Sequence, residues 1–114
     1  MKRMVLEIDG REVAFASNAA MPIKYRTWTG RDYYRDIAVA TDPTSPSFDI
    51  RVLYDVAWTF ARIADPEGVP DSAEAWLESF DTFDPLAVVT ELAKAFAEDS
   101  KQLKKPRAEG KRSK

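Results

Sequence analysis

The chain has 114 residues, of which 45% are hydrophobic, and its formal net charge at pH 7 is −2. This length suits a single domain with one modest core. The absence of cysteine excludes disulfides and thiolate metal sites, and it favours a reducing, intracellular compartment. Histidine is absent too, which excludes the commonest zinc ligands and most nucleophile–base pairs, so we expect a protein that is not an enzyme and has no cofactor.

The N-terminal segment predicts a β-hairpin with strands over residues 4–8 and 11–16. Apolar and polar residues alternate on both sides of Asp9-Gly10. An Asp-Gly pair between such runs is typical of a two-residue turn, because both turn residues must adopt positive φ.

Helical spacing begins after the hairpin. A first helix is predicted over 19–28, capped by Ser17 or Asn18 and followed by Gly30 just past its end. Its start shifts to residue 21 if Pro22 occupies the first turn, where proline is tolerated. The residues expected on its inward face are Ala20, Ile23 and Thr27 or Trp28.

A second helix is predicted over 33–40, followed by a break at TDPTSPS, residues 41–47. The apolar set of this helix is Tyr33, Tyr34, Ile37 and Ala40. A third helix over 49–64, capped by Ser47 or Asp49, has the clearest stripe in the chain and is expected to lie at the centre of the core. The stripe comprises Ile50, Leu53, Tyr54, Ala57, Trp58 and Ala61.

Two further helices are predicted after DPEGVP, residues 65–70. Asp71 and Glu74 have capping-box spacing and open a short helix over 72–80. Asp84 caps the last helix, 85–103, with Pro85 at its first position. Its inward residues are Leu86, Val89, Leu92, Ala93 and Phe96. The predicted fold class is therefore α+β, mainly α: an N-terminal β-hairpin followed by about five helices in a small bundle.

The charge is distributed unevenly. Of the 17 basic and 19 acidic residues, seven basic and one acidic lie in residues 101–114, which leaves a net charge of −8 in residues 1–100. The seven are Lys101, Lys104, Lys105, Arg107, Lys111, Arg112 and Lys114. Like-charged runs at a terminus are usually disordered. We expect one domain over residues 1–103 and a basic disordered tail over 104–114.

The N-terminus, MKRMVLEIDG, meets a charged residue after only three apolar ones, which is too few for a signal peptide. No stretch approaches the roughly 18 apolar residues of a membrane span. We therefore expect a soluble cytoplasmic protein with no membrane contact.

The stretch PDSAEAWLESFDTFDP, residues 70–85, combines acids with large apolar side chains. A calcium loop is disfavoured because residues 71–84 lack the glycine of its sharp turn, and Asp71 and Asp84 are better explained as helix caps. A catalytic carboxylate pair is disfavoured because helical spacing directs Glu78 away from the apolar face. We expect no metal site here.

Four apolar residues of this stretch form the candidate partner-binding set: Trp76, Leu77, Phe80 and Phe83. Docking of the short helix onto the core is the first interpretation of this set. A two-turn helix has little core of its own in which to bury four large side chains, so part of the surface is expected to bind a partner.

Basic and aromatic residues also mix over residues 24–35, as on surfaces that bind single-stranded nucleic acid. The net charge of −8 in residues 1–100 opposes phosphate binding there. Nucleic-acid binding is therefore expected, if anywhere, in the basic tail.

Three blocks occur in a familiar order behind the hairpin: MPIKYRTWTGRDYYRDI (21–37), DVAWTFARIAD (55–65) and EAWLESFDTFDPLAVVTEL (74–92). Together they resemble the tail assembly chaperones of long-tailed, siphovirus-type bacteriophages and prophages, over about residues 4–100. The chain departs from that pattern at Trp28-Thr29-Gly30, where an aromatic residue directly beside the glycine is expected.

This resemblance implies a non-enzymatic protein of the host bacterial cytoplasm, absent from the mature virion. It would bind the tape measure protein and keep it soluble while the tail tube polymerises. The resemblance also implies self-association and a frameshifted longer product that contacts tail tube protein. The alternative function is a small adaptor or regulatory protein, anti-toxin-like or tethered to nucleic acid through its basic tail.

Overall fold

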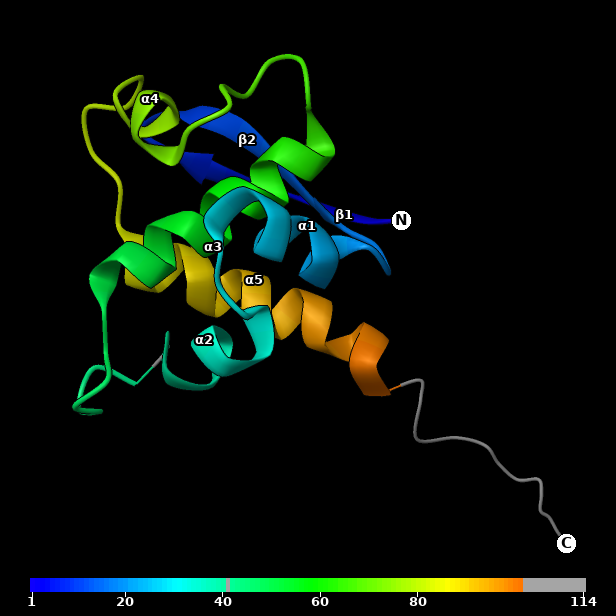
Figure 1. Ribbon diagram of the computed structural model, residues 1–114. Coiled ribbons are helices and arrows are strands. Elements are labelled where there is room, and N and C mark those ends of the chain that lie inside the picture. Colours follow the sequence, from blue (N-terminus) through cyan, green and yellow to red (C-terminus); the bar gives the residue numbers. More distant parts are fainter. Residues whose placement is uncertain (41, 102–114) are drawn as a thin grey trace, which may run out of the picture.

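The computed structural model describes residues 1–40 and 42–101 (Figure 1). Its fold class is α+β, mainly α, with a two-stranded antiparallel hairpin followed by five helices, as the sequence predicts. The elements are β1 (Lys2–Ile8), β2 (Arg11–Ser17), α1 (Met21–Thr29), α2 (Tyr33–Ala40), α3 (Ile50–Ala64), α4 (Ala73–Leu77) and α5 (Pro85–Lys101). The predicted tail over 104–114 lies outside the described residues.

The hairpin turn is the one that Asp9-Gly10 predicts. Asp9 has φ 58° and Gly10 has φ 79°, so both turn residues adopt the left-handed conformation. The strands are slightly longer than expected, and the register places Ile8 opposite Arg11 and Leu6 opposite Val13. Met4 and Leu6 pack partly against the core, while Ile8 is buried in it.

Helix α1 starts at residue 21 and ends at Gly30, whose φ of 80° confirms the predicted left-handed C-terminal position. The predicted N-cap is wrong. Asn18 accepts a hydrogen bond from the backbone N–H of Ala20, before the helix begins, so it forms a turn instead of a cap.

The predicted inward face of α1 is confirmed at Trp28, which packs partly against the core, and wrong at Ile23. Met21 and Tyr25 are buried, whereas the side chain of Ile23 is 70% exposed. Ile23 lies two positions from each, about 200° around the helix. Tyr25 occupies the inward position because its hydroxyl has a buried partner on α2.

On α2, Ala40 is buried and Tyr33 and Ile37 pack partly against the core, as predicted. Tyr34 is a correction, since it is 66% exposed. Asp36 lies inward on this helix because it meets the hydroxyl of Tyr25 and the guanidinium of Arg31.

Helix α3 lies at the centre of the fold, with the hairpin on one side and α2 on the other (Figure 1). It contacts β2 and each of the other four helices. Asp49 caps it by accepting a hydrogen bond from the backbone N–H of Arg51, one of the two caps that were predicted.

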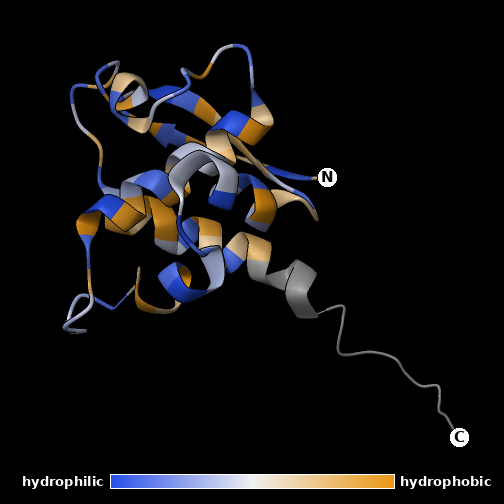
Figure 2. Cartoon of the chain, in the orientation of Figure 1, coloured by the Kyte–Doolittle hydropathy of each residue, from blue (hydrophilic) through white to orange (hydrophobic). Residues whose placement is uncertain are grey.

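The predicted stripe of α3 is confirmed at its inner positions and wrong at Ile50, which is 52% exposed. Leu53, Ala57, Trp58 and Ala61 are buried, and so are residues outside the stripe, such as Val56. The helix is buried on several sides because it has neighbours on several sides. Figure 2 shows hydrophobic and hydrophilic residues alternating along this helix and along the hairpin.

Helix α4 is shorter than predicted and has a different cap. Ser72, not Asp71, accepts a hydrogen bond from the backbone N–H of Ala75. The helix ends at Leu77, because the next residues leave it to meet the hairpin, where Arg11 donates to the backbone oxygen of Ser79.

Helix α5 begins at Pro85, and Asp84 caps it by accepting from the backbone N–H of Ala87, as predicted. Val89, Leu92 and Phe96 are buried. Leu86 and Ala93 are half-buried, and Val88, which was not predicted, is buried beside them. The expected end at residue 103 lies outside the described residues.

Candidate functional site

The four predicted partner-binding residues lie together, and we call them the α4 cluster: Trp76, Leu77, Phe80 and Phe83. Trp76 is its anchor, with only 5% of its surface exposed. Its ring packs edge-on against Phe80 at 5.3 Å and Phe83 at 5.4 Å between centroids. It also reaches Phe15 of the hairpin at 6.5 Å. Trp76 therefore belongs to the core of the chain.

The other three members of the α4 cluster are only half-buried, and each borders a surface hollow. Leu77 lines a hollow of about 300 Å³ together with Tyr54 and Ala73. Phe80 lines one of about 340 Å³ with Val13 and Val69. Phe83 lines a third, of about 560 Å³, with Ile8 and Val88. These hollows are lined by both apolar and charged residues and are open to solvent.

Acidic side chains rim this region. Glu74 and Glu78 border the hollow beside Leu77, and Glu7, Asp9 and Asp84 border the one beside Phe83. Glu78 is exposed, as its helical position predicts. Within residues 1–40 and 42–101, no group of three or more carboxylates is placed to hold a metal ion.

The α4 cluster is held to the hairpin by polar contacts that sequence analysis missed. The Arg11 guanidinium lies 4.1 Å from the centre of the Phe80 ring, and it donates to the backbone oxygen of Ser79 at 2.9 Å. Asp9 accepts from the backbone N–H of Asp81 at 2.9 Å. The turn that closes the hairpin therefore also fixes the segment after α4.

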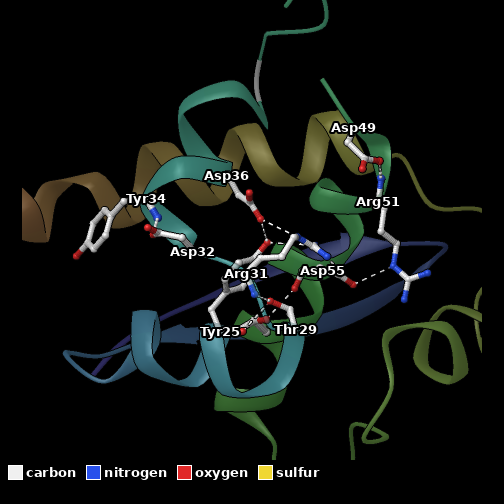
Figure 3. A network of polar contacts seen from close by, with 10 residues as sticks. Tyr25, Thr29, Arg31, Asp32, Tyr34, Asp36, Asp49, Arg51 and Asp55 are labelled. Carbon is white, nitrogen blue, oxygen red and sulfur yellow. Dashed lines mark hydrogen bonds and ion pairs between the residues drawn. The ribbon is translucent and has the colours of Figure 1, made fainter. Parts of the chain in front are cut away.

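A second cluster of functional groups lies between α1, α2 and α3, and Figure 3 shows its contacts. The Tyr25 hydroxyl donates to Asp36 at 2.6 Å, and the Arg31 Nε donates to the same carboxylate oxygen at 2.9 Å. The other end of the Arg31 guanidinium pairs with Asp55 of α3, which Arg51 also contacts. Asp36 and Asp55 are 8% and 4% exposed.

The pKa shifts in this polar network follow from burial and from the ion pairs. Burial, followed by the hydrogen bond to Asp36, raises the pKa of Tyr25. Burial alone would lower the pKa of Arg31, but hydrogen bonds to Asp55 and Asp36 outweigh it and the pKa is raised. Tyr25 therefore stays neutral and Arg31 stays charged.

This network is structural and not catalytic in form. Both of its carboxylates are held in ion pairs, Asp36 with Arg31 and Asp55 with Arg31 and Arg51, so neither is left free to act as a base. The network joins the α1–α2 turn to α3. It also engages Arg31, one arginine of the basic and aromatic stretch over residues 24–35, in ion pairs with two carboxylates of the protein. In that stretch Lys24 lies over Trp28, 5.3 Å from the ring centre.

Tyr33 is expected to make the stability of the folded chain depend on pH in the alkaline range. Burial raises its pKa to about 12 from the ordinary value of 10.0. The unfolded chain loses this proton near pH 10 while the folded chain keeps it, so the stability contributed is complete below pH 10 and declines as pH rises towards 12. We expect the urea concentration at the midpoint of unfolding to be lower at about pH 11 than at about pH 9. The difference should be smaller in Tyr33→Phe. An equal fall in both proteins would show that Tyr33 does not contribute.

No protein-family model matches the chain, and neither a curated protein nor a solved structure matches it. Among the described residues, no helix has both the length and the apolar character needed to cross a membrane.

Proposed function

We propose that this chain is a non-enzymatic phage tail assembly chaperone, which binds the tape measure protein and keeps it soluble while the tail tube polymerises around it. The observation that carries the proposal is the α4 cluster. Three of its members, Leu77, Phe80 and Phe83, are half-buried beside surface hollows, on a rigid support provided by Trp76.

Such a surface suits a helical client. An amphipathic helix binds by placing anchor side chains at i, i+3 or i+4, and i+7 into apolar depressions. The α4 cluster offers separate depressions beside Leu77, Phe80 and Phe83. The acidic rim at Glu74 and Glu78 keeps the remaining surface hydrated, which favours a soluble complex.

The same proposal assigns the protein to the host bacterial cytoplasm, outside the mature virion. It includes contact with tail tube protein through a frameshifted longer product. These parts rest on the resemblance of the three sequence blocks to tail assembly chaperones.

The test is co-expression with a candidate tape measure protein encoded beside this chain. The client is expected to stay soluble and to co-purify with several copies of this chain, whereas alone it aggregates. If a folded chain leaves the client insoluble, and instead binds nucleic acid in a salt-dependent way that requires residues 101–114, the adaptor function replaces this one.

Leu77→Ser tests the surface within that assay. Leu77 borders the hollow beside Tyr54 without being part of the stacked aromatic rings, so the change removes an anchor while the Trp76 core remains. We expect co-purified client to fall about tenfold, the loss of one interface anchor of about 1–2 kcal/mol.

Ile23→Ser is the matched control, since Ile23 is 70% exposed on α1, outside the α4 cluster. It should leave client binding unchanged. Equal co-purification by Leu77→Ser and by the unmodified chain, with circular dichroism showing both folded, would exclude Leu77 from the client surface.

A further inference from the structure

We propose that two copies of this chain pair through the open edge of β1, forming a four-stranded antiparallel sheet across a two-fold axis at Val5. The inference rests on strand geometry and charge and does not depend on the proposed chaperone function. A two-stranded sheet has two edges, and here they differ. The edge along β2 borders residues 65–70, and Ala16 on that strand is fully buried, whereas β1 borders residues 82–88 at its Glu7 end.

The edge along β1 presents unpaired backbone groups. The residues that flank a two-residue turn exchange hydrogen bonds, and the pattern then alternates along the strands. Ile8 is paired with Arg11, so Leu6, Met4 and Lys2 also direct their backbone groups at β2. The N–H and C=O groups of Arg3, Val5 and Glu7 therefore point away from it. Within the described part of the chain, none of these three has a backbone hydrogen bond outside the hairpin.

The side chains at this edge are exposed and include an apolar one. Arg3 and Glu7 are exposed, and Val5 between them is 56% exposed. An exposed edge strand with an apolar residue at its centre is a template for pairing with another strand.

The charged residues of β1 are complementary to those of a second, antiparallel copy of β1. In an antiparallel pair centred on Val5, the Val5 residues of the two copies face one another, and Arg3 of each copy lies opposite Glu7 of the other. The hydrogen-bonded pairs of this seam are all odd-numbered residues, and these are the residues whose backbone groups are open. The arrangement therefore forms a hydrogen-bonded ladder and two opposite-charge pairs together.

Pairing also relieves an unfavourable contact within the hairpin. Glu7 lies directly opposite Glu12 in the β1–β2 register, and like charges in that position destabilise a sheet. Among the described residues, no ion pair includes Arg3 or Glu7. Arg3 of the second copy would supply the positive charge that Glu7 lacks.

The test is a charge exchange followed by sedimentation velocity over a range of concentrations. The unmodified chain is expected to reach twice the mass of a single chain as concentration rises. Arg3→Glu places acids opposite acids at both ends of the seam, and Glu7→Arg places arginines opposite arginines. Each is expected to weaken dimerisation about tenfold or more.

An equal mixture of the two variants is the decisive sample. The glutamate introduced in one variant would then face the arginine introduced in the other, and the remaining Glu7 would face the remaining Arg3, so the mixed dimer is expected to re-form. Glu67→Arg changes the net charge as Glu7→Arg does, but at an exposed loop residue away from the seam, and should still dimerise. A monomeric unmodified chain, single variants that dimerise normally, or a mixture that remains monomeric would each overturn the proposal.

Discussion

Replacement of Trp76 with alanine is expected to lower the free energy of unfolding by about 3–5 kcal/mol, the range for deleting a large buried aromatic side chain. Trp76 is 5% exposed and contacts rings from the hairpin and from the segment after α4. Its removal would leave a cavity that three elements share. Because Phe15, Phe80 and Phe83 are held by their own neighbours, the site cannot collapse completely.

Urea unfolding followed by circular dichroism measures this effect, since the signal does not rely on the tryptophan that is removed. Trp28→Ala is the control. Trp28 is half-buried on α1 and packs against Trp58 and Arg62 near the surface. Trp28→Ala should therefore lower the free energy of unfolding by less than Trp76→Ala does. If the two substitutions destabilise the chain equally, Trp76 is not the anchor of the α4 cluster.

Replacement of Arg31 with methionine is expected to lower the free energy of unfolding by about 2–4 kcal/mol, somewhat less than for a fully buried pair because the side chain is 35% exposed. The change leaves Asp36 buried without its cation, and Asp55 keeps only its 3.3 Å ion pair with Arg51. Methionine keeps an apolar side chain of similar length, so the fall in the free energy of unfolding reflects chiefly the lost charge and hydrogen bonds.

Arg35→Met is the matched control, because Arg35 is an exposed arginine on α2, a few residues away. Its effect should stay within about 0.5 kcal/mol, as for ordinary surface substitutions. Urea unfolding of both variants at neutral pH makes the comparison. An Arg31 variant as stable as the Arg35 variant would contradict the structural role of the network.

The fold class could be predicted from sequence because its signals are local. Asp9-Gly10 fixes the turn, Asp49 and Asp84 cap two helices, and Gly30 ends another. The apolar stripe of α3 identified the central helix. Each of these features depends on residues within a few positions of one another, where backbone conformation and capping decide the outcome.

The errors in the inward faces of α1 and α2 occur where a partner on another element decides which side of the helix faces inward. Asp36 and Asp55 lie outside the predicted apolar sets, yet Arg31 and Tyr25 make their burial favourable. With Asp36 inward, Tyr34 turns to solvent, although it belonged to the predicted apolar set of this helix. The only local signal was a carboxylate within an apolar stretch on each of two helices, and that signal does not identify its partner.

The candidate site was found in part. The four residues of the α4 cluster do lie together, as their spacing predicts, but burial divides them into one core anchor and three half-buried side chains. That division depends on Phe15 and Arg11, which are more than sixty residues away in the sequence. Periodicity within residues 70–85 carries no information about them.

The central claim is that the α4 cluster binds a helical client. The most direct measurement is hydrogen exchange of the purified full-length chain, with and without a soluble helical segment of the candidate tape measure protein. The predicted result is saturable binding with protection concentrated over residues 73–88, and an affinity about tenfold weaker in Leu77→Ser but unchanged in Ile23→Ser. Binding that protects other elements and leaves residues 73–88 unchanged, or no binding by the folded chain, would contradict the claim.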